Sequence, residues 1–441
     1  MARTNVQPRV DALAMLGGPA LRPAGQAPYN TIGEREKRAV IDVLENGELS
    51  GFVASAGEEF WGGKQVRALE ADFKAHFAVR HAIAVNSATS GLHCATMAMG
   101  LGPGDEVIVT PYTMSASATA IVMTGAVPVF ADIEDETFGL DPASVRANIT
   151  PNTRGIMAVN IFGHGARLDE LRAIAKEHDL FLIEDNAQAP DAVYRGRKTG
   201  TIGNCGVFSL NRHKTIQSGE GGVVITNDDN LALRLALVRN HGEVVVSAMR
   251  VEDLANTMGL NYRMTEMEAA VARIQFERLG ELNSARQANA DYLTRRLAEI
   301  PGVTPPAVEK GCTHVYYLYC MKYEETVVGL PRDLFCEAVT AEGFYTRAGY
   351  IKPVYLEPMY QRKVGFGRGG FPFTANSRNA TLSYRKGLCP VTERMQDREL
   401  ILTTAFRPPS EKRDIDLYID AIRKVVANRS ALLEHHARRA Q

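Results

Sequence analysis

The sequence predicts an α/β protein, with a mostly parallel central sheet covered by helices and a smaller C-terminal α+β domain. Two patterns carry this prediction. Short apolar runs alternate with helical patterns through the first two thirds of the 441 residues, as expected when crossover helices join parallel strands. Several of these runs contain no polar alternation, which is typical of strands that are covered on both faces.

The predicted strands and helices alternate along the chain. Strand patterns lie at residues 81–85, 106–110, 127–131, 155–160, 180–183, 207–209 and 223–226. Helical patterns lie between or after them, at residues 90–99, 115–124, 142–149, 168–177 and 231–239. This order favours a doubly wound sheet, in which helices cover both faces.

A long helix is predicted to follow this sheet. Thr265 and Glu268 match a capping box, in which each side chain satisfies a free amide at the start of a helix. Apolar residues then repeat with helical spacing toward Leu297, and a proline- and glycine-rich break follows at 301–306. Beyond the break, short strands and helices are mixed, at residues 314–321, 332–342 and 414–426.

We therefore expect two domains and two tails. The large α/β domain should cover residues 14–285, and the small α+β domain residues 286–429. Residues 1–13 and 430–441 are expected to be flexible tails. The sequence shows no internal repeat.

Composition excludes several functional classes. The chain has 50 Lys and Arg against 51 Asp and Glu, so it lacks the basic excess that nucleic-acid binding requires, and no nucleic-acid partner is expected. Its six cysteines are not spaced as C-x-x-C and its histidines do not form a ligand motif, so we expect no metal. The uncharged stretch 107–131 contains Pro111 and Gly125, which favours strand, loop and helix over a membrane span. We expect a cytoplasmic protein without a membrane partner.

Polar residues follow the first predicted strand. Residues 86–91 read Asn-Ser-Ala-Thr-Ser-Gly and lead into a helix. Free amides and the positive end of the helix dipole at such a site can hold an anion, with Thr89 and Ser90 as candidate ligands. A simple helix cap explains the same residues equally well.

A carboxylate follows the fifth predicted strand. Three apolar residues, 181–183, would deliver Asp185 to the sheet edge, where ligands of open α/β sheets bind. There it could pair with a protonated heterocycle nitrogen. A helix cap or a structural ion pair is the alternative, and the motif alone does not decide.

A lysine lies on the loop after the sixth predicted strand. Ser209 and Lys214 are followed by the glycine-rich run 218–222. Pyridoxal 5′-phosphate (PLP) needs a lysine for an imine, an acid at its ring nitrogen and a cup for its phosphate. The three strand ends together offer all three, whereas Lys214 alone would be read as a solvated surface lysine.

These motifs resemble those of the DegT/DnrJ/StrS family, fold-type-I PLP enzymes that are mostly nucleotide-sugar and cyclitol aminotransferases. The resemblance covers roughly residues 14–428, and its most specific element is the run Ser-x4-Lys-x4-Gly-Glu-Gly-Gly that begins at Ser209. The other matching segments are 16–19, 86–93, 102–108, 125–130, 184–188, 239–242 and 261–264.

The resemblance implies catalytic and cofactor-binding roles. Lys214 would form the imine and move protons, Asp185 would keep the ring nitrogen protonated, and Gln188 would lie beside the phenolic oxygen. The phosphate cup would be formed by Thr89, Ser90 and Ser209. Asn261 matches a residue that reaches the phosphate held by the neighbouring subunit, which implies a homodimer with shared active sites.

One position departs from the family pattern. An aromatic residue usually stacks on the cofactor ring in the loop after the second strand, and Met114 occupies that position here. Either its thioether packs on the ring or Tyr112 does so. The segment 50–63, which contains the only tryptophan, looks longer than usual and could shape the acceptor pocket. Candidates for that pocket are Arg239, Arg263, His314 and Tyr316.

Three functions are compatible with these residues. The first is transfer of an amino group from glutamate or glutamine to a keto-sugar, nucleotide-linked or free, or to a keto-cyclitol. The second is a PLP-dependent lyase, dehydratase or cyclase on the same scaffold; dehydratases that resemble this family replace the lysine with histidine, which Lys214 argues against. The third is a non-enzymatic regulator, which the retained set of Lys214, Asp185 and Ser209 disfavours.

Overall fold

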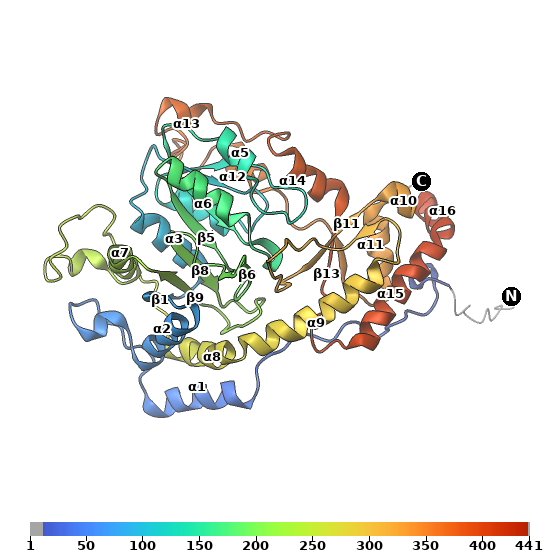
Figure 1. Ribbon diagram of the computed structural model, residues 1–441, viewed down its shortest axis with the longest axis horizontal. Helices are drawn as coiled ribbons and strands as arrows, with labels where there is room; N and C mark the ends of the chain where they lie inside the picture. The colour runs from blue at the N-terminus through green and yellow to red at the C-terminus, as the bar shows by residue number, and fades with distance from the viewer. Residues whose placement is uncertain (1–11, 440–441) are drawn as a thin grey trace.

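A seven-stranded sheet forms the centre of the molecule (Figure 1). The computed structural model describes residues 12–439. Strand β9 is antiparallel to β1 and β8, and all other neighbours are parallel, which confirms the predicted mostly parallel sheet. The strand order is β1 (His81–Val85), β9 (Gly222–Thr226), β8 (Cys205–Ser209), β5 (Phe181–Asp185), β4 (Thr153–Val159), β2 (Glu106–Val109) and β3 (Val127–Phe130).

Helices cover both faces of this sheet. Successive strand residues alternate between the two faces: Val107 and Val109 pack with the helices of one face, and Ile108 packs on the other. The first face carries α3 (Ala88–Ala98), α4 (Ala116–Met123) and α7 (Asp229–Arg239). The second carries α2 (Lys64–Phe77), α5 (Pro142–Ala147), α6 (Leu168–Glu177) and α8 (Glu266–Glu277).

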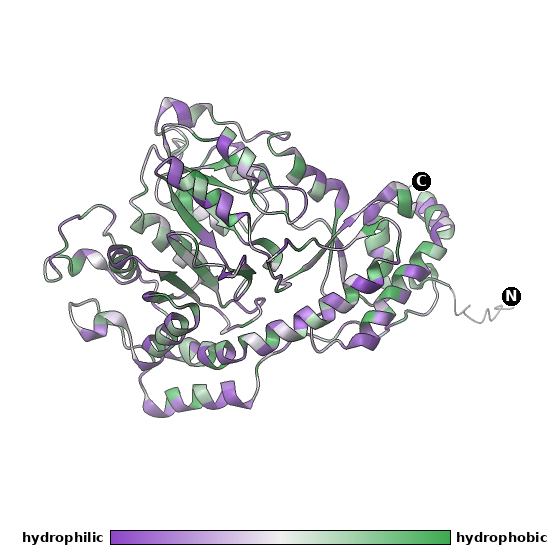
Figure 2. Ribbon diagram, in the orientation of Figure 1, coloured by the Kyte–Doolittle hydropathy of each residue, from purple (hydrophilic) through white to green (hydrophobic). Residues whose placement is uncertain are grey.

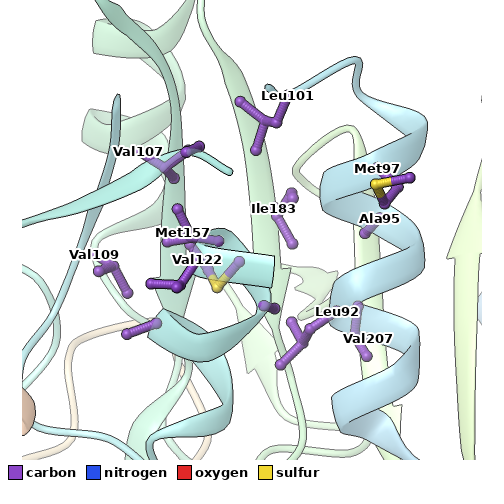
Figure 3. Packing of buried hydrophobic residues seen from close by; sticks show 14 of the residues in the cluster. Leu92, Ala95, Met97, Leu101, Val107, Val109, Val122, Met157, Ile183 and Val207 are labelled. Atoms are coloured by element: carbon purple, nitrogen blue, oxygen red, sulfur yellow. The ribbon is translucent and has the colours of Figure 1, made fainter. Parts of the chain in front are cut away.

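The packing on the first face is continuous and apolar. Leu92 of α3, Val122 of α4 and Ile183 of β5 fill the space between helices and sheet (Figure 3). The strands of the sheet are coloured mainly as hydrophobic, whereas the outer helices carry hydrophilic bands (Figure 2). Burial of these apolar residues therefore fixes the sheet, and the strand ends that carry polar residues are held in place.

The expected long helix is two helices. Helix α8 ends at Glu277, and α9 (Leu279–Leu297) begins after a break at Arg278. The Arg278 guanidinium contacts the buried Glu36 carboxylate and the Thr31 carbonyl. The capping box at Thr265 and Glu268 is present. In Figure 1, α9 runs from beneath the large sheet to the smaller one.

The smaller unit contains a four-stranded antiparallel sheet. Its order is β10 (Val303–Thr304), β11 (Tyr319–Tyr323), β13 (Leu400–Thr403) and β12 (Thr346–Ala348). Helices α11 (Arg332–Ala341) and α15 (Lys412–Ala427) share its apolar core. Residues 314–318 precede β11 as irregular backbone, held in part by a bridge between His314 and His164.

The remaining elements are short or lie at the edges. They are α1 (Glu34–Asn46), β6 (Val193–Tyr194), β7 (Arg197–Lys198), α10 (Glu325–Val328), α12 (Pro358–Gln361), α13 (Ser377–Thr381), α14 (Pro390–Arg394) and α16 (Arg429–Arg439). Helix α16 corrects the expectation of a flexible C-terminal tail as far as residue 439, because Leu432 is buried in the core of the small unit. The expected N-terminal tail lies almost wholly outside the described residues.

Two segments pack far from their neighbours in sequence. Leu13 is buried in the core of the small unit, and the Ala14 amide donates to the Glu342 carboxylate at 2.9 Å. Conversely, Tyr355 and Tyr384, which come from the later part of the chain, are buried against the large sheet. None of the helices within residues 12–439 has both the length and the apolar character needed to span a membrane.

Candidate active site

The polar strand ends meet at one cavity. The ends of β5 and β8 and the start of α3 lie at the same edge of the sheet, as expected for the carboxyl ends of neighbouring parallel strands. The cavity there has a volume of about 320 Å³. Six of the eight predicted site residues line it: Thr89, Met114, Asp185, Gln188, Ser209 and Lys214.

Asp185 is held at the floor of this cavity. Its side chain is only 5% exposed. The Ser117 hydroxyl donates to Oδ2 at 2.7 Å, and the Ala187 amide donates to Oδ1 at 3.2 Å. Burial raises the pKa of this carboxyl, against the opposing effects of the Ser117 and Ala187 hydrogen bonds and the Lys214 charge. The carboxylate is therefore fixed in direction and suited to a cationic partner.

Lys214 enters the same cavity from a closed loop. The Leu210 amide donates to the Gly221 carbonyl at 2.9 Å, and the Ser218 amide donates to the Leu210 carbonyl at 2.8 Å. The Lys214 amine lies 4.6 Å from the centre of the Tyr317 ring. Burial lowers the pKa of this amine to about 8, while Asp185 raises it and Arg407 lowers it further. A considerable fraction of the amine is thus neutral and nucleophilic near pH 8.

The start of α3 lies at the same cavity and could hold an anion. Ser87 caps this helix, since its hydroxyl accepts from the Ser90 amide at 3.0 Å. Ser87 and Thr89 both line the cavity. A Cβ at Gly222 would lie 2.7 Å from the Ala88 nitrogen, so the glycine permits β9 to approach the helix start. The first turn of the helix supplies free amides to an anion there.

Ser90 is placed differently from the other predicted phosphate ligands. Its hydroxyl donates to the Asn86 Oδ1 at 2.6 Å and contacts the Ser87 hydroxyl at 2.8 Å. The side chain is buried and does not line the cavity. Ser90 therefore supports the turn, with Thr89 and Ser209 nearer to the space that an anion would fill.

Gln188 is oriented by two neighbours. Its Oε1 accepts from the Phe162 amide at 2.8 Å, and its Nε2 donates to the Tyr350 hydroxyl at 3.1 Å. Tyr350 itself lines the cavity. This places a polar amide–phenol pair beside the Asp185 and Lys214 side chains.

The two candidates for the stacking position are separated by the structure. Met114 is 61% exposed and lines the cavity. Tyr112 is fully buried, and its hydroxyl donates to Gln396 Oε1 at 3.1 Å, away from the cavity lining. Asn261 is exposed and does not line the cavity of its own chain.

Several lining residues were not found from the sequence. Tyr317, Tyr350 and His213 line the cavity. His314 and Tyr316, considered for the acceptor pocket, instead stack on each other with ring centres 4.1 Å apart, and neither belongs to the cavity lining. The run His-Val-Tyr-Tyr at 314–317 contains no signal that distinguishes the phenol that enters the cavity from the one that does not.

Arg239 and Arg263 also lie outside the cavity lining. The Arg239 guanidinium is buried and pairs with the Glu70 carboxylate at 2.7 Å. The Arg263 Nε donates to the Asn240 Oδ1 at 2.9 Å. Both side chains thus have structural partners.

The residues present fit PLP. The cofactor requires a nucleophilic lysine, a carboxylate for its ring nitrogen and an anion site for its phosphate. One cavity presents the Lys214 amine with its lowered pKa, the oriented carboxylate of Asp185 and the start of α3.

Comparison with known proteins identifies relatives of this chain. A model of the DegT/DnrJ/EryC1/StrS aminotransferase family matches residues 32–400. The spore coat polysaccharide biosynthesis protein SpsC of Bacillus subtilis (strain 168) is 32% identical over 407 residues, which cover 90% of this chain and 97% of that protein. The L-glutamine:scyllo-inosose aminotransferase of Streptomyces griseus is 37% identical over 356 residues, which cover 79% of this chain and 83% of that protein.

The fold is also similar to that of solved structures. A crystal structure of DesI, determined in the presence of its TDP-sugar product, superposes with a TM-score of 0.80 at 29% sequence identity. The match covers 97% of this chain and 100% of that chain. The similarity therefore extends over the large and the small sheets alike.

Proposed function

The chain belongs to the DegT/DnrJ/EryC1/StrS aminotransferase family, and from this we propose that it is a PLP-dependent enzyme that carries its cofactor on Lys214. It would move an amino group from glutamate or glutamine to a keto-sugar or keto-cyclitol in a biosynthetic pathway. The observation that carries the proposal is that the Lys214 amine and the Asp185 carboxylate line a single cavity beside a helix start.

The cofactor would be held at three points. Thr89 and Ser209, with the amides at the start of α3, would bind its phosphate. Asp185 would accept a hydrogen bond from its ring nitrogen, with Ser117 fixing the carboxylate. Gln188 would lie beside its phenolic oxygen, and Met114 would pack on its ring. When bound, PLP supplies an electron sink that stabilises negative charge on the substrate carbon.

Lys214 would act as the proton carrier. Its amine, with a pKa lowered by burial to about 8, can accept a proton from the carbon of the donor and return one to the carbon of the product. The backbone hydrogen bonds that close the loop 210–221 hold this amine at the cavity. The Asp185 carboxylate remains ionised opposite the ring nitrogen, because the cationic partner there offsets its burial.

The proposed substrates are supported by the relatives. The Streptomyces griseus enzyme is named for L-glutamine and scyllo-inosose, and DesI was crystallised with a TDP-sugar. We propose a keto-sugar, nucleotide-linked or free, or a keto-cyclitol as the acceptor class.

We further propose a cytoplasmic homodimer with shared sites. Asn261 is exposed outside the cavity of its own chain, as a residue that serves a neighbouring subunit would be. The nearby Leu254 and Met258 are exposed apolar side chains, which a partner subunit would cover. The six cysteines are free, in keeping with a reducing compartment.

Absorbance spectroscopy tests the proposal. The purified protein with PLP should show the band of the lysine-bound cofactor, and this band should bleach when glutamate or glutamine is added without an acceptor. A panel of keto-sugars and keto-cyclitols should then restore the band as the amino product forms. Lys214→Ala should bind the cofactor without showing the band.

The other two functions predict different results. Bleaching by no amino donor, together with turnover of an amino acid alone, would indicate a lyase, dehydratase or cyclase. A protein that takes up no PLP would indicate the non-enzymatic regulator. Either outcome overturns the proposal.

A further inference from the structure

Two arginines near the cavity lack acidic partners. Arg286 is fully buried, and its Nε and Nη2 have no hydrogen-bond acceptor. Arg407 is partly buried, and its buried Nε is also unpaired. Across residues 12–439, neither guanidinium forms an ion pair with a carboxylate, in contrast to the buried Arg239, which pairs with Glu70.

The contacts that these two arginines do make are neutral. Arg286 lies over the Tyr29 ring, with its Cζ 4.5 Å from the ring centre, and donates to the Tyr316 carbonyl at 3.4 Å. Arg407 donates to the Tyr317 carbonyl. Burying a guanidinium without a counter-ion is costly. Such a pair is typical of a site whose negative charge arrives with a ligand.

Arg407 lies beside the reacting amine. The Lys214 Nζ and the Arg407 Cζ are 4.6 and 5.5 Å from the centre of the same Tyr317 ring. The charge of Arg407 lowers the pKa of both Lys214 and His213, and both of these residues line the cavity. Arg407 is not itself among the lining residues, but the Tyr317 ring that it contacts is. The guanidinium therefore lies behind that ring, within electrostatic reach of the Lys214 amine.

The charges facing this end of the cavity do not balance. Lys214 and Arg407 are cationic here, with Arg286 behind them. The lining carboxylates are Asp185 and Glu220. Asp185 faces Ser117 at the floor, and Glu220 accepts from the Asn211 side chain at 3.0 Å. An incoming carboxylate would compensate the excess positive charge.

We propose that Arg407, backed by Arg286, binds the α-carboxylate of the amino donor. This inference rests on the proposed function, because it requires an amino-acid donor. In an amino acid the carboxylate is attached directly to the carbon that bears the amine, so a cation near Lys214 meets that group. The phosphates of a nucleotide-linked acceptor lie farther from the reacting carbon. Guanidinium and carboxylate can form two parallel hydrogen bonds, which fixes the orientation of the donor.

The donor half-reaction provides the test. Arg407→Gln should reduce the rate constant over Kd for bleaching by L-glutamine by about 100-fold, since one partner of a buried charge pair is removed. Arg407→Lys should recover part of the loss, because an ammonium group restores the positive charge but cannot form the two parallel hydrogen bonds of a guanidinium. Arg212→Gln, an exposed arginine on the Lys214 loop, is the matched control and should behave as the wild type.

A second donor separates recognition from mere structural support. The wild type should prefer L-glutamine to L-glutamine α-amide, which lacks the carboxylate charge, and Arg407→Gln should lose that preference. A general distortion around Tyr317 would slow both donors alike and overturn the inference. An unchanged donor step with a weakened acceptor step would instead assign Arg407 to acceptor phosphates.

Calorimetry with glutarate gives a readout that is independent of turnover. Glutarate carries carboxylates but no amine, and it should bind the wild-type holoenzyme more tightly than it binds Arg407→Gln. If glutarate binds the wild type more tightly than Arg407→Gln while no donor transfers an amino group, the proposed function fails and the carboxylate site stands. If amino transfer proceeds and neither glutarate binding nor donor preference depends on Arg407, only this inference fails.

Discussion

At the scale of single residues, the site depends on two buried ionisable groups that modify each other. Asp185 raises the pKa of Lys214, and the charge of Lys214 lowers that of Asp185. Burial favours the neutral form of both groups, because it raises the pKa of the Asp185 carboxyl and lowers that of the Lys214 amine. Burial lowers the pKa of Lys214 to about 8, so that the amine is more often neutral than an exposed lysine, which suits it to attack a carbonyl and to carry protons.

Replacing Lys214 should abolish amino transfer without destabilising the fold. Lys214→Ala removes a side chain that is not part of the apolar core, so the far-ultraviolet circular dichroism and the Tm should stay close to those of the wild type. Amino transfer should fall by at least about 1,000-fold, because the nucleophile and the proton carrier are both lost. Lys37→Ala, at an exposed position of helix α1, should retain full activity. A Lys214→Ala variant with normal transfer would contradict the assignment.

The lowered pKa predicts a pH dependence for the cofactor-free protein. A lysine must be neutral to react, so covalent uptake of PLP should rise with pH, pass its midpoint near pH 8 and level off above it. Asp185→Asn removes a charge that favours the cationic amine, and should move this midpoint to lower pH. Arg407→Gln removes an opposing charge and should move it upward.

Stopped-flow absorbance measures this uptake. Nα-acetyl-lysine, whose ε-amine is free, serves as the reference for an exposed lysine amine. Its uptake should have a midpoint at about pH 10.4. A midpoint for the protein near that of acetyl-lysine would show that Lys214 is solvated and would contradict the buried environment described above.

At the scale of elements, helix starts do much of the positioning. Ser87 caps α3 beside the cavity, and Thr265 caps α8 on the far face of the sheet. The two caps use the same chemistry, a hydroxyl that accepts from a backbone amide. Ser87 lines the cavity, where we propose that the helix start binds an anion, and Thr265 does not line it.

Removing the second cap should affect stability alone. Thr265→Ala loses the hydroxyl that accepts from the Glu268 amide at 3.2 Å, which should cost about 1 kcal/mol of unfolding free energy. The Tm should fall by about 1–3 °C, while the rate of the donor half-reaction stays unchanged. Scanning calorimetry and single-turnover absorbance measure the two effects. Thr326→Ala, at an exposed threonine of α10, is the control, and an equal loss there would contradict the capping role.

At the scale of the whole molecule, the cavity combines distant parts of the chain. Asp185 and Lys214 come from the large sheet, whereas Tyr317 and Tyr350 come from segments beside the small one. Helix α9 joins the two sheets (Figure 1). The relative placement of the sheets therefore determines which side chains face the substrate.

Mixed dimers test whether two subunits share each site. Lys214→Ala and Asn261→Ala should each be impaired as homodimers. After unfolding and refolding of a 1:1 mixture, mixed dimers should contain one site with both native residues. Activity should then reach about a quarter of the wild-type value, because random pairing makes half of the dimers mixed and each holds one complete site.

The control for this experiment pairs Lys214→Ala with a Lys214→Ala, Asn261→Ala double variant. No subunit in that mixture has the lysine, so mixing should restore nothing. Recovery only to the Asn261→Ala level in the first mixture would place the residue outside the partner's site. Analytical ultracentrifugation of each mixture tests whether dimers are present.

Much of the fold was predictable, because its signals are local. The seven strands of the large sheet were expected within a few residues of their observed bounds, since each is an apolar run bounded by turn residues. The break between α8 and α9 was not expected: apolar spacing continues through Arg278, and the break coincides with its contacts to Thr31 and Glu36. Helix α16 was missed because its hydrophilic sequence buries only Leu432.

The sequence by itself determined the strand ends, and with them Asp185, Ser209 and Lys214, because polar residues that follow parallel apolar strands must gather at one edge of the sheet. It also determined the family. Only the tertiary structure decided that Met114 rather than Tyr112 lines the cavity, that Ser90 turns inward, and that Tyr317 and Tyr350 join the lining, with Arg407 against the Tyr317 ring. Ser90 is held by its near neighbours Asn86 and Ser87. The other side chains are placed by packing between segments that are far apart in the chain, and such packing leaves no local pattern in the sequence.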